Sequence, residues 1–334
     1  MSKAPHRLCT LGIALIASLF PVAGFALDTS RPEVSAFVTR MSTEHGFSNE
    51  QTLLILDQAE IQPRIIEAMS RPAEKTKPWF EYRQIFLTEK RIAAGVEFWN
   101  AHSEELEAIS KRTGVPPQII VGIIGVETFF GRITGSYRVL DALATLAFDY
   151  PPRSAFFTSE LEQFLLLAQE QGIDPLTATG SYAGAMGSPQ FISSSYRAYA
   201  SDGDDDGRID LWSSWADVFA SVANYFKAHK WQTAERVVTP VSGTVPPSLL
   251  SNGVRLDRTV AELTAAGVEF DHSGDTGDKA MLFSLDQETG PEYWVGFRNF
   301  YVITRYNRSN MYAMAVYELG RDIAARINDD PTPD

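Results

Sequence analysis

The chain has 334 residues, of which 44% are hydrophobic and 21% charged, and its formal net charge at pH 7 is −13. This composition is typical of a globular protein with an ample core, and the length favours two or three domains over one. The acidic balance argues against nucleic acid as a partner, because binding to phosphates needs basic patches.

The first segment, residues 1–26, is predicted to be a signal peptide. An uncharged apolar run over 11–22 follows a basic start, and Gly24 and Ala26 place small residues at the −3 and −1 positions of a cleavage site. A retained anchor is the alternative, although a membrane span needs about 20 apolar residues. The only cysteine, Cys9, is not at the cleavage site. We therefore expect a soluble mature protein with neither lipid anchor nor disulfide. It is also expected to be periplasmic and monomeric.

Residues 27–112 are predicted to form an N-terminal helical module, because their apolar residues recur at helical spacing. A catalytic core over 113–232 follows, and its first helix begins at two prolines, which the first turn tolerates. The nearly apolar run 119–126 predicts a helix buried on most sides, where Gly122 and Gly125 allow another element to approach closely. Further helices are predicted for 159–171, 191–200 and 215–228.

The pattern changes after this core, and 233–297 is predicted to be a small β-containing insertion. It holds three short β-like runs between Gly, Asp and Ser clusters, at 237–241, 267–270 and 279–284. Residues 298–328 return to helical spacing as a C-terminal part of the core, with one helix over 301–327. The tail, 329–334, is predicted to be disordered. The expected fold class is therefore mainly α, with a small β part (α+β).

A single carboxylate, Glu127, closes the apolar helix and is followed by Phe129 and Phe130. Desolvation and the negative end of the helix dipole are both expected to raise the pKa of Glu127. A carboxylic acid that stays protonated near neutral pH can protonate a glycosidic oxygen. The alternative is a structural glutamate paired with Arg132 or Arg138, and chemistry alone does not separate the two.

Two further segments suit a carbohydrate site, although each has an ordinary alternative. The glycines of 180–191 do not match a phosphate loop, because no lysine follows them. They would let the backbone lie close to a flat sugar, with Ser181 and Gln190 offering polar contacts; the alternative is a plain turn. Segment 299–313 repeats aromatic and amide side chains at about helical spacing, which also fits a helix with a polar face.

An acidic loop places Asp202, Asp204 and Asp206 at positions 1, 3 and 5 of an EF-hand calcium pattern, with glycine at position 6. Position 12 is Ser213, where an EF-hand carries a bidentate glutamate, but Asp217 lies four residues further and could complete the site. The alternative is a solvated acidic loop. A single such loop predicts a structural calcium site rather than a sensor.

Together these motifs resemble the lytic murein transglycosylase B family, peptidoglycan lyases with a goose-lysozyme-like catalytic core. The resemblance runs from about residue 33 to 327. The matching text is H-G-F at 45–47, G-V-P-P at 114–117, I-I-V-G-I-I-G-V-E-T at 119–128, L-D-A-L-A-T-L at 140–146, A-G-A-M-G at 183–187, Q-F at 190–191, S-V-A-N-Y-F-K-A-H at 221–229 and I-T-R-Y-N at 303–307.

The resemblance implies a role for each matching residue, with Glu127 as the catalytic acid and base. Substrate-binding positions beside it are Ser181, Gln190, Tyr306, Asn307 and Tyr312. The implied calcium ligands are Asp202, Asp204, Asp206, the carbonyl of Arg208, and Asp217. No organic cofactor is implied. Two segments beside the expected cleft depart from the family pattern. Phe129-Phe130 stands where some members have Arg-Trp, and Ser188-Pro189 stands where some have Tyr-Gly. Both departures bear on subsite preference.

The implied substrate is the glycan strand of peptidoglycan, and other cell-wall enzymes are candidate protein partners. The implied reaction cleaves the β-1,4 bond between N-acetylmuramic acid and N-acetylglucosamine without water and leaves a 1,6-anhydro end. A hydrolytic muramidase is the alternative, and it would need a second carboxylate, about 5–9.5 Å away. The acids weighed for that role are Asp141, Asp149 and Glu162. A non-catalytic glycan-binding protein is a further alternative.

Overall fold

The computed structural model describes residues 24–70, 77–243 and 245–329. The predicted signal peptide lies outside these residues except for its last three, and the predicted disordered tail lies outside them except for Asp329, which ends a helix. Within the described part of the chain, no helix combines the length and apolar character needed to cross a membrane. The fold is mainly α with a small β part, as predicted.

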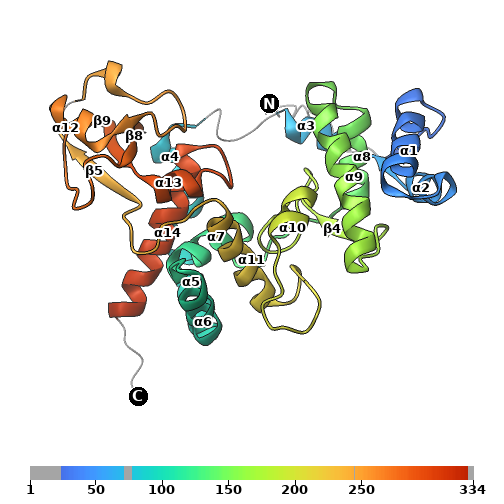
Figure 1. Cartoon of the computed structure of the whole chain (residues 1–334), viewed down its shortest axis with the longest axis horizontal. Helices are drawn as coiled ribbons and strands as arrows, with labels where there is room; N and C mark the ends of the chain where they lie inside the picture. The colour runs from blue at the N-terminus through green and yellow to red at the C-terminus, as the bar shows by residue number, and fades with distance from the viewer. Residues whose placement is uncertain (1–23, 71–76, 244, 330–334) are drawn as a thin grey trace, which may run out of the picture.

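One end of the molecule is built from helices that come from two separate parts of the sequence (Figure 1). The N-terminal elements pack on a helix pair further along the chain. These elements are β1 (Phe25–Ala26), α1 (Pro32–His45), α2 (Asn49–Leu56), β2 (Glu60–Ile61) and α3 (Pro63–Met69), and the pair is α8 (Val139–Phe148) and α9 (Ser154–Gln171). β1 and β2 form a two-stranded antiparallel sheet.

The next three helices pack elsewhere, against the middle of the molecule. They are α4 (Trp79–Phe86), α5 (Glu89–Ala101) and α6 (Ser103–Thr113), and their partners are α7 (Pro117–Thr128), α11 (Trp215–Ala228) and α14 (Asn310–Asp329). The helices of the predicted N-terminal module thus form two groups, one before residue 71 and one after residue 76 in the sequence. The proposed division into domains stays a prediction.

The single five-stranded sheet of the described residues lies at the opposite end from α1 and α2 (Figure 1). Its order is β6-β8-β9-β5-β7, all paired antiparallel: β5 (Val238–Ser242), β6 (Arg258–Thr259), β7 (Glu269–Phe270), β8 (Lys279–Gln287) and β9 (Gly290–Gly296). α12 (Val260–Ala265) packs on it, and Val260, Leu263, Leu282 and Val295 belong to a separate apolar cluster. All five strands fall within the predicted insertion, although β6 and β9 match none of the three predicted runs.

The C-terminal part differs from the prediction of one helix over 301–327. α13 (Arg298–Ile303) ends early, and α14 begins only at Asn310. The intervening turn carries Tyr306 and Asn307, and the N–H groups of Arg305 and Tyr306 donate to the carbonyls three residues before them instead of four. Aromatic residues continue at helical spacing across this turn, which is why the sequence pattern conceals it.

α7 forms the centre of the molecule and packs closely on α14. A Cβ added at Gly122 would lie 2.5 Å from the Val316 carbonyl oxygen, and one at Gly320 would lie 2.0 Å from the Gln118 carbonyl oxygen. Such close approach of two helix backbones requires residues without side chains. The prediction that Gly122 serves a close contact is thereby confirmed, and the contact fixes the positions of residues on both helices.

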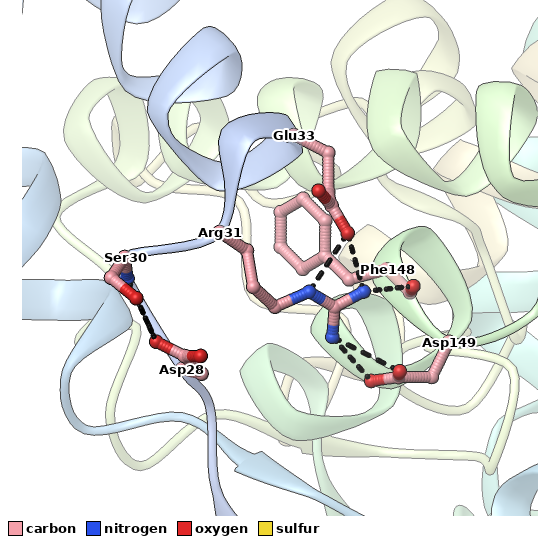
Figure 2. A network of polar contacts seen from close by, with 6 residues as sticks. All are labelled: Asp28, Ser30, Arg31, Glu33, Phe148 and Asp149. Carbon is pink, nitrogen blue, oxygen red and sulfur yellow. Dashed lines mark hydrogen bonds and ion pairs between the residues drawn. The ribbon is translucent and has the colours of Figure 1, made fainter.

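A polar network fastens the start of α1 to the end of α8 (Figure 2). The guanidinium of Arg31 donates to Glu33, to the carbonyl of Phe148 at 2.6 Å and to both oxygens of Asp149, at 3.0 and 3.3 Å. Arg31 is partly buried, and its donors satisfy the backbone carbonyl at the last residue of α8. Arg31 therefore links the start of α1 to the end of α8.

Candidate active site

Glu127 lies at the C-terminal end of α7, where the chain reverses through three consecutive left-handed residues. The φ angles of Phe129, Phe130 and Gly131 are 51°, 57° and 76°. Two adjacent aromatic residues in this region are uncommon, because a Cβ is disfavoured there. Phe130 is buried against Phe98, at 5.3 Å between ring centroids, and this packing holds the turn. The reversal leaves the side chain of Glu127 partly exposed at the helix end.

A half-buried cation, Arg91 of α5, supports this end of α7. Its Nη1 donates to the Gly125 carbonyl at 2.7 Å, and its guanidinium lies 4.7 Å from the ring centroid of Phe129 and 5.3 Å from that of Phe86. Burial lowers the pKa of Arg91. A cation at a helix C-terminus opposes the negative end of the dipole. No sequence pattern points to Arg91, because its partners at the end of α7, Gly125 and Phe129, lie more than thirty residues further along the chain.

The hydroxyl of Tyr312 donates a hydrogen bond to Oε1 of Glu127. Tyr312 stands in the first turn of α14 and is buried. Burial, followed by the nearby charge of Glu127, raises the pKa of Tyr312 well above its ordinary value. The phenol therefore remains a neutral donor, and it stabilises the carboxylate form of Glu127.

Tyr306 lies beside the same carboxylate, in the turn before α14. Its hydroxyl donates to the Pro189 carbonyl at 3.0 Å, and its ring packs on Tyr225 at 4.7 Å between centroids. Burial and then the charge of Glu127 raise its pKa well above the ordinary value. Asn307 is next in the turn, and its backbone carbonyl accepts the N–H of Ser309 at 2.7 Å.

The glycine-containing loop at 180–191 is held by the two polar residues that the sequence singled out. Oγ of Ser181 accepts the N–H of Ala185 at 3.1 Å. Nε2 of Gln190 donates to the carbonyls of Thr134 and Gly187, both at 3.0 Å. Each side chain keeps further capacity, since a hydroxyl can still donate and the amide oxygen of Gln190 can still accept. Both residues are partly exposed.

This loop is joined on one side to α7 and on the other to the acidic loop. Oγ1 of Thr128, the residue after Glu127, donates to the Ser188 carbonyl at 2.9 Å. The N–H of Ser188 donates to the Leu211 carbonyl at 2.8 Å. Gly187 permits this approach: its φ is 66°, and an added Cβ would lie 2.3 Å from the Leu211 oxygen. One side-chain and one backbone hydrogen bond thus connect the candidate acid to both loops.

The acidic loop brings together three of the five predicted metal ligands. Carboxylate oxygens of Asp202, Asp204 and Asp217 all lie within 4.8 Å of one another. Three hard oxygen donors at this spacing suit calcium. The fourth acid, Asp206, is not part of this cluster, and its Oδ1 accepts the N–H of Arg208 at 2.8 Å.

Asp217 closes the acidic cluster from the first turn of α11. It is buried, and its two oxygens accept the N–H groups of Gly203 and Asp210, both at 2.7 Å. Burial raises the pKa of Asp217. The sequence suggested this residue as a replacement for position 12 of the EF-hand pattern, and the structure places it beside Asp202 and Asp204.

The acids weighed as a second carboxylate are each held in an ion pair: Asp141 by Arg138 at 2.8 Å, Asp149 by Arg31 at 3.0 Å, and Glu162 by Arg40 at 2.7 Å. Asp141 is buried, and burial raises its pKa. The ion pairs of Asp149 and Glu162 connect α1 to α8 and to α9, whereas that of Asp141 lies within the start of α8. The two arginines weighed as partners of Glu127 contact other acids, Arg138 as above and Arg132 with Glu97 at 3.8 Å.

The chain is similar to known proteins over nearly its whole length. A family model described as the transglycosylase SLT domain matches residues 29–321. The membrane-bound lytic murein transglycosylase B of Escherichia coli K12 is 44% identical over 308 residues, which are 89% of this chain and 84% of that protein.

Two solved structures extend the likeness to the fold. Soluble lytic transglycosylase SltB1 from Pseudomonas aeruginosa has 52% identity and a TM-score of 0.84, covering 89% of this chain and 100% of its own. Escherichia coli lytic transglycosylase Slt35 in complex with calcium has 43% identity and a TM-score of 0.82, covering 91% and 96%.

Proposed function

This chain belongs to the transglycosylase SLT-domain family, and we propose that Glu127 is the residue with which it cleaves its substrate. It is a lytic murein transglycosylase, an enzyme that cuts the glycan strands of peptidoglycan without water. The hydrogen bond from Tyr312 to Glu127 carries the assignment, because it holds one carboxylate where α7, α14 and the 180–191 loop meet.

In the proposed mechanism, Glu127 acts first as an acid and then as a base. It protonates the oxygen that leaves N-acetylmuramic acid, and the N-acetyl carbonyl of that sugar stabilises the positive charge at C1. The resulting carboxylate takes the proton of the C6 hydroxyl, whose oxygen closes the 1,6-anhydro ring on C1. Tyr312 stabilises the carboxylate between the two steps, when Glu127 carries its charge. General acid and base catalysis of this kind contributes about 10²–10⁴-fold.

The polar groups assigned to substrate binding are neutral, and this favours the lyase over a muramidase. Ser181, Gln190, Tyr306 and Asn307 can orient an N-acetyl group and a C6 hydroxyl, but they are poor bases for water. Hydrolysis requires a second carboxylate that serves as nucleophile or activates water. The three acids weighed for that role are each held in an ion pair with an arginine.

The acidic loop is proposed to hold a structural calcium ion. Asp202, Asp204 and Asp217 would be its ligands, with Asp206 and the carbonyl of Arg208 as further oxygen donors. Bound calcium would neutralise the mutual repulsion of these acids and cross-link the loop to α11. Slt35 was solved in complex with calcium, which supports the proposal. A periplasmic location as a soluble monomer, and contacts with other cell-wall enzymes, are part of the same proposal.

The test is to digest purified sacculi with the wild type and with Glu127→Gln, and to analyse the released muropeptides by mass spectrometry. The wild type is expected to give 1,6-anhydro ends, lighter by one water than muramidase products and unlabelled in heavy-oxygen water. Glu127→Gln should stay folded and lose at least ~10²-fold in activity. The matched control is Glu97→Gln, which should stay fully active. Glu97 is an exposed glutamate of α5 that pairs with Arg132, shortly after the end of α7. Reducible, labelled ends, or an active Glu127→Gln, would refute the assignment.

A further inference from the structure

A hollow of about 420 Å³ lies between the C-terminal end of α9 and residues 208–212 of the acidic loop. Its volume is within the range of small-molecule sites. An aromatic ring and aliphatic side chains form part of its wall, and polar groups stand among them: Gln171, Ile173, Thr177, Arg208, Ile209 and Trp212. Asp174 and Asp210 also line it, and both accept backbone N–H groups of their own loops. An apolar surface beside a few hydrogen-bonding groups is typical of sites for small polar organic ligands.

The indole of Trp212 is fixed in this wall. Its Nε1 donates to the Thr179 carbonyl at 3.0 Å, and one side of the ring meets the buried Tyr196 at 6.1 Å between centroids. The backbone N–H of Trp212 donates to Asp210 at 2.8 Å. The ring is only partly covered, and its remaining surface lines the hollow. A ring held in this way loses little conformational entropy when a ligand packs on it.

The hollow is connected to the candidate acid by two hydrogen bonds, one from a side-chain hydroxyl and one between backbone groups. Thr128, next to Glu127, holds the carbonyl of Ser188, and the N–H of Ser188 donates to the carbonyl of Leu211, next to Trp212. On the other side, Thr179 belongs to β4 (Thr179–Gly180), directly before Ser181. The wall of the hollow is therefore continuous with the loop that flanks Glu127.

We propose that this hollow is a remote subsite for one amino-sugar unit of the glycan strand, beyond the two units that flank the cleaved bond. The C–H face of a pyranose ring carries partial positive charge and packs on the negative face of an indole. Hydroxyl and N-acetyl groups at the edge of the sugar would meet polar side chains such as Gln171 and Thr177. The inference rests on the proposed function only in taking a glycan strand as the substrate.

The test measures binding without cleavage, on the Glu127→Gln background, by calorimetry with peptide-free glycan oligomers. Trp212→Leu, which keeps apolar bulk but removes the aromatic face, should weaken binding of a four-disaccharide strand about five- to tenfold. Binding of a single disaccharide should be unchanged. Trp212→Phe should restore long-strand affinity to within about twofold, since the face remains. Phe156→Ala, at an exposed aromatic residue of α9 that does not line the hollow, is the control and should change neither affinity.

A variant at a second residue keeps the proposal testable if the Trp212 variants do not fold. Thr177→Phe adds bulk at an exposed position of the hollow and leaves the core intact, so it should weaken only long-strand binding. Equal losses for both ligand lengths, or full long-strand affinity in Trp212→Leu and Thr177→Phe, would overturn the proposal. Shortening of the oligomers by Glu127→Gln during the measurement would instead count against the assignment of the acid.

Discussion

Replacing Tyr312 with phenylalanine would remove one hydroxyl beside Glu127 and leave the buried ring in place. The lost hydrogen bond favours the carboxylate over the carboxylic acid. A hydrogen bond to a charged group contributes about 1.5–3 kcal/mol, and one pH unit corresponds to about 1.4 kcal/mol. Without this bond the acid form of Glu127 persists to higher pH. The alkaline limb of the kcat/KM profile should therefore move up by about 1–2 pH units.

The alkaline limb of the wild type is not expected to arise from the phenol itself. Burial and the charge of Glu127 raise the pKa of Tyr312 well above its ordinary value, so Tyr312 stays protonated throughout an assay from pH 4 to 9. At the optimum, kcat/KM should fall about 10- to 100-fold, because the same hydrogen bond stabilises the charge that develops on Glu127.

The assay is the pH dependence of kcat/KM on soluble glycan fragments, for the wild type and two matched variants. Tyr306→Phe is the control, because its hydroxyl donates to the Pro189 carbonyl rather than to Glu127. It should lower the rate without moving the alkaline limb. If Tyr312→Phe also left the limb in place, the hydrogen bond would have no role in setting the protonation of Glu127, and the reasoning would fail.

Three predictions concern stability, each measured as a shift in thermal or urea unfolding. Calcium at 100 times its Kd should stabilise the protein by about 2.7 kcal/mol and chelation should reverse this, whereas Asp202→Ala should respond to neither. Gly187→Ala should cost at least ~2 kcal/mol, since both its φ of 66° and the Leu211 carbonyl oppose a Cβ; Gly172→Ala, with the same φ but open space, should cost only about 1 kcal/mol. Arg31→Met should cost about 1.5–3 kcal/mol by leaving the Phe148 carbonyl and Asp149 without their donor. Shifts within error of zero would contradict each.

The sequence pattern predicted a helix or strand correctly where burial is uniform along the element. It failed where the chain turns between two helices or where a strand is largely exposed. The apolar run before Glu127 predicts α7, and 215–228 matches α11 residue for residue. β9 escaped detection because it begins with Gly290 and two further exposed residues, so its first half carries no alternating pattern. The break between α13 and α14 escaped because aromatic spacing persists through the turn.

The candidate site shows the same limit. Glu127 is recognisable because a lone carboxylate at the end of an apolar helix is unusual in any sequence. Its partner Tyr312 follows from the resemblance only, since the contact spans 185 positions. Arg91 has no local signal at all, because its donor role exists only once α5 packs beside the end of α7. Side chains that position other groups are defined by tertiary contacts, and a sequence pattern does not record those.

The connections between the loops explain why one carboxylate can act at a fixed position in a protein without disulfides in its described part. Thr128 ties the end of α7 to Ser188, and Ser188 is tied to Leu211. Asp217 in turn binds the N–H of Asp210, one residue before Leu211. Anything that neutralises the acidic cluster therefore stiffens a chain of hydrogen bonds that ends beside Glu127. A cation in the acidic loop would thus support catalysis through geometry, without contacting the substrate.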